Sequence, residues 1–449
     1  MNRELTIAVT ADSHLGRKYP TMEFREDDIN RGFDLFLDSI ISDRPDILIH
    51  GGDLFDTVFP PGWIFERGLS GMQSLPEPET DLTVTEEARG EEVAPNIFIV
   101  HGNHDGTADP RCESGCFSVL KYFDSMSLAN YLDVRRADED IYFPRFVCRS
   151  PEVSLAIQGL GHRSTSQFQN LLGDMKPVDG VDHNILVVHQ AISDLTTPYT
   201  RGDVLPMDLF LDRGFDLVIA GHTHRPVDDR AQGTRFIIPG SSERMDSGEF
   251  GERRGYYLVR MTPDEIECAF RMVDLDVVRK IRKYEVDVDA LSGTEITRRC
   301  MESVTDPDLS DALVYFLLRG QTPHGHRDVD REGIEERLVG MGARSVKINT
   351  QKIIMKEIGE LVTDAEWRNV RITAETFNRL FSERNIRDLS GNPIRDQSLI
   401  SRLSDAAYGM FSAYERDRKE EIPEILDRKL MGIAEELHRE REEETVEDR

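Results

Sequence analysis

The chain has 449 residues, which is too long for one ordinary domain and predicts two or three folded units. Hydrophobic residues make up 39% of it and charged residues 31%, a balance typical of a soluble globular protein with some extra surface charge. The formal net charge of -29 argues against a polyanionic partner, unless bound divalent metal ions supply positive charge where the two meet.

The five cysteines are an odd number spread over the chain. They predict free thiols in a reducing compartment and not a disulfide framework. No apolar run reaches the roughly 18 residues that a membrane-spanning helix needs. The sequence therefore predicts a cytoplasmic protein with no membrane partner.

A short apolar strand over residues 5–9 leads into Asp12-Ser13-His14. This D-x-H pattern places two metal-ligand side chains just beyond a strand end, where α/β proteins carry their active sites. Residues 27–41 follow with apolar side chains at helical spacing, and Pro45 closes that helix.

The next buried strand, residues 46–50, is followed by Gly51-Gly52-Asp53-Leu54-Phe55-Asp56. The two glycines let the backbone approach closely while Asp53 reaches into the cleft. A second helix is expected from Trp63 to Gln73. The result is a strand-helix-strand unit with carboxylates at both strand ends.

The segment from Glu77 to Pro95 holds seven acidic residues against one arginine and shows little apolar periodicity. We predict a mobile surface loop there. A gate that repels the wrong substrates is one interpretation, and an acidic solvated surface without a function is the other.

The apolar run from Ile97 to Val100 leads into His101-Gly102-Asn103-His104-Asp105. An asparagine that offers a carbonyl oxygen, with a histidine beside it at the mouth of a buried strand, suits a metal-bound phosphate. Two later apolar strands also end in histidine, the first at His189 and the second at Gly221-His222-Thr223-His224. Histidines at such strand ends are typical of a metal site on a sheet edge.

The composition changes near Leu275, and residues 279–351 read as strand, helix, strand, helix, strand. The remainder is strongly charged, with helical periodicity that fits packing on its own domain and docking to a partner equally well. We therefore expect a first domain over residues 1–272, a small α+β domain over 273–360 and a charged helical segment over 361–449.

Five separated stretches together offer seven metal-ligand side chains: Asp12, His14, Asp53, Asn103, His189, His222 and His224. Carboxylate, imidazole and carboxamide oxygen suit a pair of borderline-hard ions such as Mn(II), with Fe(II) or Zn(II) as alternatives. Any one of these residues alone fits a structural role. Seven of them at strand ends predict a two-metal centre.

The pattern D-x-H, G-D-x-x-D, G-N-H-D, H and G-H-x-H resembles the calcineurin-like metallophosphoesterase superfamily. Within it, three stretches resemble the SbcD and Mre-eleven nucleases of DNA double-strand-break repair: Gly52-Asp53-Leu54-Phe55-Asp56, Val188-His189-Gln190 and Pro239-Gly240-Ser241-Ser242-Glu243-Arg244-Met245-Asp246. The resemblance implies an α/β fold, a two-sheet sandwich flanked by helices, with an α+β capping domain that shapes DNA access and a C-terminal helical segment. It also implies exonuclease and endonuclease activity on DNA ends by phosphodiester hydrolysis, in a nucleoid-associated protein.

The resemblance assigns the ligands to two metal ions: one held by Asp12, His14, Asp53 and His224, the other by Asp53, Asn103, His189 and His222. Two ions roughly 3.5 to 4 Å apart support an in-line displacement at phosphorus. His104 is the implied proton donor. Asp56 stands where several archaeal and eukaryotic members have histidine, and there it would accept a hydrogen bond from the His104 imidazole.

Contacts to DNA phosphates are expected from basic residues near the motifs and in the second domain: Arg17, Lys18, Arg163, Arg225, Arg253, Arg254, Arg279, Lys280, Arg282 and Lys283. The resemblance further implies a homodimer formed through helices that include Trp63 to Gln73. It also implies docking of an SMC-like ATPase of the SbcC or Rad-fifty type on the C-terminal segment. The alternatives are a small-molecule or cyclic-nucleotide phosphodiesterase and a partner-binding scaffold with a vestigial metal site.

His104→Ala is expected to keep the metal ions and to lose most turnover, because His104 is implied as a proton donor and not as a ligand. Metal content by elemental analysis and kcat on a phosphodiester are the two measurements. Equal activity in the variant and the wild type would contradict this role.

Overall fold

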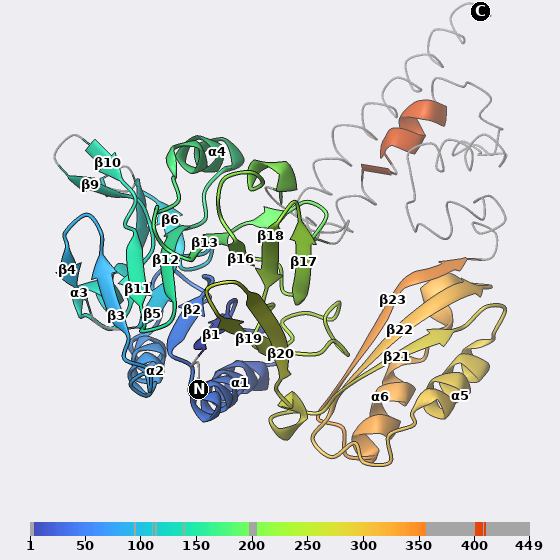
Figure 1. Cartoon of the computed structure of the whole chain (residues 1–449). Coiled ribbons are helices and arrows are strands. Elements are labelled where there is room, and N and C mark those ends of the chain that lie inside the picture. Colours follow the sequence, from blue (N-terminus) through green and yellow to red (C-terminus); the bar gives the residue numbers. More distant parts are fainter. Residues whose placement is uncertain are drawn as a thin grey trace, which may run out of the picture. The chain divides into compact units, whose positions relative to one another are not determined.

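The computed structural model describes residues 4–93, 96–109, 111–112, 115–137, 140–196, 204–355, 400–406 and 408–409 (Figure 1). The chain divides into two compact units, the first made of residues 1–282 and 311–313 and the second of 283–310 and 314–449. Most of the expected C-terminal helical segment lies outside the described residues, although residues 400–406 and 408–409 are helical.

The first unit contains a six-stranded sheet in the order β20-β19-β1-β2-β5-β8. Its strands are β1 (Leu5–Thr10), β2 (Ile47–His50), β5 (Ile97–Ile99), β8 (Asn130–Tyr131), β19 (Gly255–Met261) and β20 (Ile266–Met272). Strands β1, β2, β5 and β8 are parallel, whereas β19 and β20 join antiparallel at the β1 edge. The carboxyl ends of the four parallel strands therefore meet at one edge.

An eight-stranded sheet in the order β17-β18-β16-β13-β12-β11-β3-β4 faces the first one. Its strands are β3 (Thr83–Glu86), β4 (Glu91–Glu92), β11 (Phe146–Arg149), β12 (Ser154–Leu160), β13 (His183–His189), β16 (Leu217–Gly221), β17 (Val227–Ala231) and β18 (Thr234–Ile238). The four central strands β12, β13, β16 and β18 are parallel. This second parallel core delivers the histidines of the site.

The prediction of a mobile loop over Glu77 to Pro95 is wrong for its middle part. Strand β3 pairs antiparallel with β11, and Val84 and Glu86 on β3 are buried. Strand β4 extends this sheet by one short edge strand. The high acidic count obscured a period-two pattern in Thr83–Glu86 that places alternate side chains in the core.

One apolar core lies between the two sheets. Side chains from β1 and β2, such as Ile7 and Ile49, meet side chains from β12, β13 and β16, such as Ile157, Val187 and Ile219. A second cluster joins the outer face of the first sheet to helices, and a third joins the outer face of the second sheet to α4 (Thr165–Asp174). The predicted two-sheet α/β sandwich flanked by helices is confirmed.

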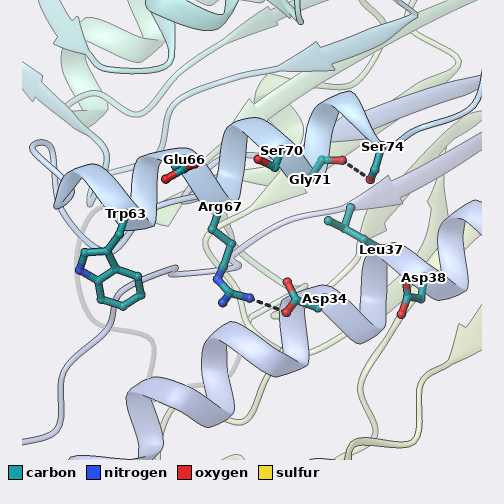
Figure 2. A pocket seen from close by; sticks show the side chains of 9 residues that line it. All are labelled: Asp34, Leu37, Asp38, Trp63, Glu66, Arg67, Ser70, Gly71 and Ser74. Carbon is teal, nitrogen blue, oxygen red and sulfur yellow. Dashed lines mark hydrogen bonds and ion pairs between the residues drawn. The ribbon is translucent and has the colours of Figure 1, made fainter.

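The two helices predicted in the first unit are α1 (Phe24–Asp43) and α2 (Gly62–Gln73), and a short α3 (Lys121–Ser125) follows. Gly71 lets α2 pack closely on α1, because a Cβ atom there would lie 2.6 Å from Leu37 Cδ1 and 2.9 Å from Phe33 Cε1 (Figure 2). The close packing of these two helices covers the first sheet beside the strand ends.

The second unit is a three-stranded sheet in the order β21-β22-β23 with two helices. The elements follow the predicted order: β21 (Ile281–Asp287), α5 (Gly293–Ser303), β22 (Leu313–Thr322), α6 (Arg331–Gly340) and β23 (Ser345–Met355). Ser292 and Glu295 form a capping box at the start of α5, and Asp330 caps α6 by accepting from the Gly333 N–H.

Shorter elements complete the described residues: β6 (Gly106–Ala108) with β7 (Cys116–Ser118), β9 (Arg135–Ala137) with β10 (Asp140–Tyr142), β14 (Ala191–Ile192) with β15 (Val204–Leu205), η1 (Met207–Leu209), η2 (Leu275–Val277) and η3 (Gly325–Asp328). In the part of the chain that the structure describes, no helix has the length and apolar character to cross a membrane.

Candidate metal centre

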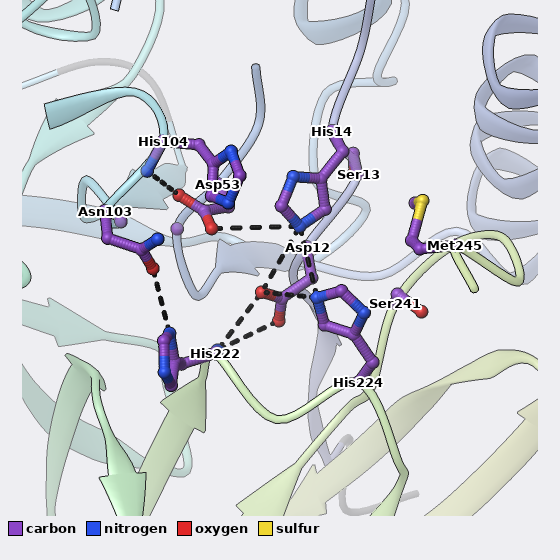
Figure 3. A network of polar contacts seen from close by, with 12 residues as sticks. Asp12, Ser13, His14, Asp53, Asn103, His104, His222, His224, Ser241 and Met245 are labelled. Carbon is purple, nitrogen blue, oxygen red and sulfur yellow. Dashed lines mark hydrogen bonds and ion pairs between the residues drawn. The ribbon is translucent and has the colours of Figure 1, made fainter. Parts of the chain in front are cut away.

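The predicted ligands gather where the parallel strands of both sheets end (Figure 3). Asp12 follows β1, Asp53 follows β2 and Asn103 follows β5, all in the first sheet. His189 ends β13 and His222 follows β16 in the second sheet. Because parallel strands present their carboxyl ends on the same side, residues up to about 210 positions apart meet here, as in the hydrogen bonds from His222 N to both Asp12 oxygens at 3.1 Å.

The first cluster of ligand atoms surrounds His14 and His224. Their Nε2 atoms face each other at 3.2 Å, and they lie 4.0 and 3.8 Å from Asp12 Oδ1. The Nδ1 atom of each ring meets a carboxylate, Asp56 at 3.1 Å and Glu249 at 2.7 Å, so each Nδ1 is the protonated nitrogen. Both Nε2 atoms then present lone pairs to each other, an arrangement that suits a cation between them.

The second cluster centres on His189. Its Nδ1 donates to the Gly51 carbonyl at 2.7 Å, and its Nε2 is turned toward the carboxylates of Asp12 and Asp53. That Nε2 is buried without a hydrogen-bond partner among the described residues and lies 3.4 Å from Asp53 Oδ2. An orphaned imidazole nitrogen beside a carboxylate is the donor set that a divalent metal ion satisfies.

Asp53 stands between the two clusters, because Oδ2 also lies 3.7 Å from His14 Nε2. Among the described residues, three groups bring ligand atoms within 4.8 Å of one another: Asp12, His14 and His224; His14, Asp53 and His104; and Asp12, Asp53 and His189. His222 is outside these groups and meets Asn103 instead, with Nδ1 2.9 Å from Asn103 Oδ1. The residues present thus fit two ions that share Asp53.

Burial shapes the electrostatics of the two carboxylates. Desolvation raises the pKa of Asp12, and neighbouring histidines only partly offset it. Burial also opposes ionisation of Asp53, but the positive charge of His189 holds the pKa of Asp53 well below its usual range. A buried carboxylate that stays ionised beside imidazoles is ready to bind a cation.

Four of the seven predicted ligands have left-handed backbone, with φ of 51° at Asp12, 46° at His14, 53° at Asp53 and 80° at His222. Each such residue costs about 1–3 kcal/mol outside glycine, so the fold must hold all four in place. Gly102 supplies the room for this, since a Cβ atom there would lie 2.0 Å from Asp53 Oδ1. The backbone of these loops therefore adopts an unfavourable conformation that brings the polar side chains together.

Asp105 is a residue to which sequence reasoning assigned no role. Its Oδ1 accepts from the Gly102 N–H at 2.7 Å, and its Oδ2 accepts from the N–H groups of Leu54 at 2.7 Å and Phe55 at 3.3 Å. Burial raises the pKa of Asp105 to about 7. One buried carboxyl therefore ties the loop that carries Asp53 to the loop with the Gly-Asn-His-Asp motif.

Glu249 was also missed, because no motif surrounds it. Its two oxygens accept from His224 Nδ1 at 2.7 Å, the Met245 N–H at 2.8 Å and the Arg254 guanidinium at 2.6 Å. Burial alone would raise the pKa of Glu249, but the bond from His224 and the charge of Arg254 lower it to about 2. Glu249 orients the ligand His224 in the way that carboxylates orient metal-binding histidines.

The imidazole Nδ1 of His104 lies 3.3 Å from Asp56 Oδ1. The backbone N–H of His104 donates to Asp53 Oδ1 at 2.8 Å. The bond with Asp56 raises the pKa of His104 to about 8. Asp56 Oδ1 also lies 3.1 Å from His14 Nδ1 and 3.3 Å from Arg17 Nη1. Asp56 therefore touches a predicted ligand as well as the predicted proton donor.

Three of the predicted DNA contacts are corrected by the structure. Arg163, Arg254 and Arg279 are only 8%, 2% and 7% exposed. They are bound to Asp133, Glu249 and Asp28 respectively. Buried guanidinium groups need such partners, so these three hold the fold and do not reach a ligand outside it.

The other predicted basic residues are wholly or partly exposed. Arg17 is half-buried beside Asp56, and Lys18, Arg225 and Arg253 are exposed around the first unit. The remaining three lie together in sequence: Arg282 pairs with Asp276, Lys283 lies 4.0 Å from Glu285, and Lys280 is half-buried.

Comparison with known proteins agrees with this geometry. Residues 5–226 match the calcineurin-like phosphoesterase family, so the first unit carries a domain of that family, as the motifs predicted. The "DNA double-strand break repair protein Mre11" of Haloferax volcanii is 28% identical over 79% of this chain and 69% of its own length.

Two further relatives widen this comparison. The protein of the same name from Halobacterium salinarum is 26% identical and covers 89% of this chain and 90% of its own length. The SbcD component of the SbcCD nuclease of Staphylococcus epidermidis is 24% identical over 64% of this chain and 73% of its own length. The similarity thus reaches beyond the phosphoesterase domain.

Glu249→Gln is expected to weaken Mn(II) binding by about 10- to 100-fold, because the amide no longer offers His224 a charged acceptor. Titration calorimetry with Mn(II) measures this. Glu252→Gln is the matched control, since Glu252 contacts Arg254 at 3.3 Å but no ligand. Equal losses in both variants would show that Glu249 acts only through the Arg254 ion pair.

Asp56→Asn is expected to move the basic limb of the kcat profile to lower pH. If protonated His104 donates the proton, wild-type activity is full below the raised pKa and falls as pH rises through about 8. Loss of the Asp56 charge lowers that pKa and shifts the fall with it. The assay uses saturating Mn(II), because His14 also loses its carboxylate partner, and an unmoved limb would contradict the dyad.

Proposed function

We propose that this protein is a two-metal-dependent DNA nuclease that processes double-strand-break ends. The observation that carries the proposal is the pair of imidazole clusters around Asp53, in which every Nδ1 of His14, His189 and His224 is engaged by oxygen and every Nε2 faces a carboxylate. The chain's similarity to Mre11 and SbcD proteins supports DNA as the substrate.

In this proposal one ion is held by Asp12, His14, Asp53 and His224, and the other by Asp53, Asn103, His189 and His222. Bound divalent ions would supply positive charge to the phosphate and acidify the attacking water. The mixed oxygen and nitrogen donors suit Mn(II), with Fe(II) or Zn(II) as alternatives.

The chain's own residues then orient the reaction. Asp105 accepts hydrogen bonds from the backbone of both the Asp53 loop and the Asn103 loop and so holds them together. The backbone N–H of His104 donates to Asp53 and orients its carboxylate. The His104 imidazole, protonated through its bond with Asp56, donates a proton toward the leaving oxygen. The exposed cations Lys18, Arg225 and Arg253, together with Arg17, are the proposed phosphate contacts around the centre.

A homodimer through α1 and α2 is part of the proposal. A groove of about 550 Å³ lies between these helices, with Trp63 at one end (Figure 2). Trp63 is 52% exposed, and Arg67 pairs with Asp34 across the groove. An exposed tryptophan on a helix face is the kind of anchor that protein interfaces bury.

The proposed ATPase partner is an SMC-like protein of the SbcC or Rad-fifty type. The staphylococcal relative is named as one component of SbcCD, a name that implies a larger assembly for that relative. The segment over residues 361–449, which we expect to dock this partner, lies almost entirely outside the described residues. We also propose that the protein acts on DNA ends in the cytoplasm.

The test is digestion of end-labelled hairpin and blunt duplex DNA with Mn(II), with and without the ATPase partner. Cleavage is expected in the wild type and is expected to be lost in Asn103→Ala and in chelator, because Asn103 supplies a ligand to the second ion. A small phosphodiester, bis(p-nitrophenyl) phosphate, is assayed in parallel. Turnover of that ester far above any DNA cleavage would favour a small-molecule phosphodiesterase, and no turnover at all would favour a scaffold.

A further inference from the structure

Phe59 and Phe117 form a stacked pair of rings, of which Phe59 faces solvent and Phe117 is half-buried. Phe59 is 75% exposed, more than any other large apolar residue among those that the structure describes. Its ring lies on Phe117, with ring centroids 5.5 Å apart and ring planes at 26°. Exposure of so much apolar surface is unfavourable and core packing does not explain it.

The pair is tied by the chain to the residues that flank the scissile phosphate in the proposed function. Phe59 comes three residues after Asp56, a stretch that spans at most about 10 Å. Phe117 lies on β7 directly opposite Thr107 on β6, and β6 begins two residues after His104. The backbone of both rings therefore lies within a few residues of Asp56 or His104, either along the chain or across the β6–β7 pairing.

The local structure restrains the backbone on both sides of the pair. The Phe59 N–H donates to Thr57 Oγ1 at 3.4 Å, and the following Pro60 restricts the Phe59 backbone to extended conformations. On the other side, Ser118 Oγ donates to the Asp105 carbonyl at 2.7 Å, which joins the β6–β7 hairpin to the metal loop. A restrained backbone reduces the conformational freedom that is lost when a ligand stacks on the side chain.

The charge of the protein indicates what that ligand is. At a net charge of -29, with Arg163, Arg254 and Arg279 consumed in buried ion pairs, phosphate contacts alone are a weak source of affinity for DNA. Stacking of a nucleobase on an aromatic ring needs no positive charge and tolerates any sequence. It is available only to a base whose face is free, at a frayed end, an overhang or a loop.

We infer that Phe59 and Phe117 form a stacking platform for an unpaired nucleobase next to the phosphate at the metal centre. The inference rests on the proposed nuclease function and specifies its substrate: DNA with unpaired bases near the cleaved bond. Phe59 presents its face to the base and Phe117 supports it from behind.

The test measures binding by the full chain in an Asn103→Ala background, so that the DNA is not cut. Overhang DNA carries 2-aminopurine at successive positions. Quenching of its fluorescence is expected at one or two positions, and Phe59→Leu is expected to abolish it and to raise Kd by about 5- to 30-fold. Phe59→Trp is expected to restore both, and Tyr122→Leu, which removes another exposed ring, is expected to change neither.

An abasic site at the quenched position completes a double-mutant cycle, in which one change removes the Phe59 ring and the other removes the base. If the ring stacks on that base, Phe59→Leu has no effect on the abasic DNA. An equal loss on intact and abasic DNA would overturn the platform. A change of oligomeric state in Phe59→Leu, measured by light scattering, would overturn it too, because the ring would then be an interface between copies.

The experiments distinguish failure of the stacking platform from failure of the proposed nuclease function. Absence of cleavage by the chain with Asn103 intact, with base-dependent quenching still present, would overturn the nuclease and support the platform as a DNA-binding surface. Cleavage of DNA with no quenching and no effect of Phe59→Leu would support the nuclease and overturn the platform.

Discussion

The structure depends on one electrostatic constraint: two buried carboxylates and several imidazole lone pairs converge on a single point between two sheets. Asp12 and Asp53 are almost fully buried, and the Nε2 atoms of His14, His189 and His224 face them or one another. The two carboxylates repel each other in a medium of low dielectric constant, and the neighbouring histidines only partly offset the cost of burying Asp12. A divalent cation bound at this point would offset the repulsion between the two carboxylates.

The surrounding residues hold this arrangement against its own repulsion. Asp105 joins two loops through backbone N–H groups, and Glu249 and Asp56 fix the tautomers of His224 and His14. The left-handed backbone at four of the predicted ligands lies above the buried apolar core between the two sheets, which holds these loops in place. These carboxylates also need counter-charges, and an arginine near the site supplies one. Arg254 forms an ion pair with Glu249 and is therefore not available to bind DNA.

Much of the fold could be predicted from periodicity. The helical spacing of Ile29, Phe33 and Phe36 predicted α1, and the order of elements in the second unit follows from its alternating patterns. Strand β3 was missed, because its acidic surroundings outweighed a four-residue alternation that pairing with β11 and β4 stabilises. The convergence of the predicted ligands could be expected, because each lies at or within four residues of the end of a buried strand. Glu249 could not, since it lies in a turn whose approach to His224 depends on the tertiary fold.

By itself, the sequence determined the chemistry: which side chains can bind metal ions, which strand ends carry them, and the family whose motifs they match. Those properties are local and are written into a few residues at each strand end. Only the tertiary structure decided which charges are free. Arg163 and Arg17 look alike in sequence, but Arg163 is buried against Asp133, whereas Arg17 stays half-exposed beside Asp56. The exposure of Phe59 was likewise decided there, because burial depends on neighbours distant in sequence.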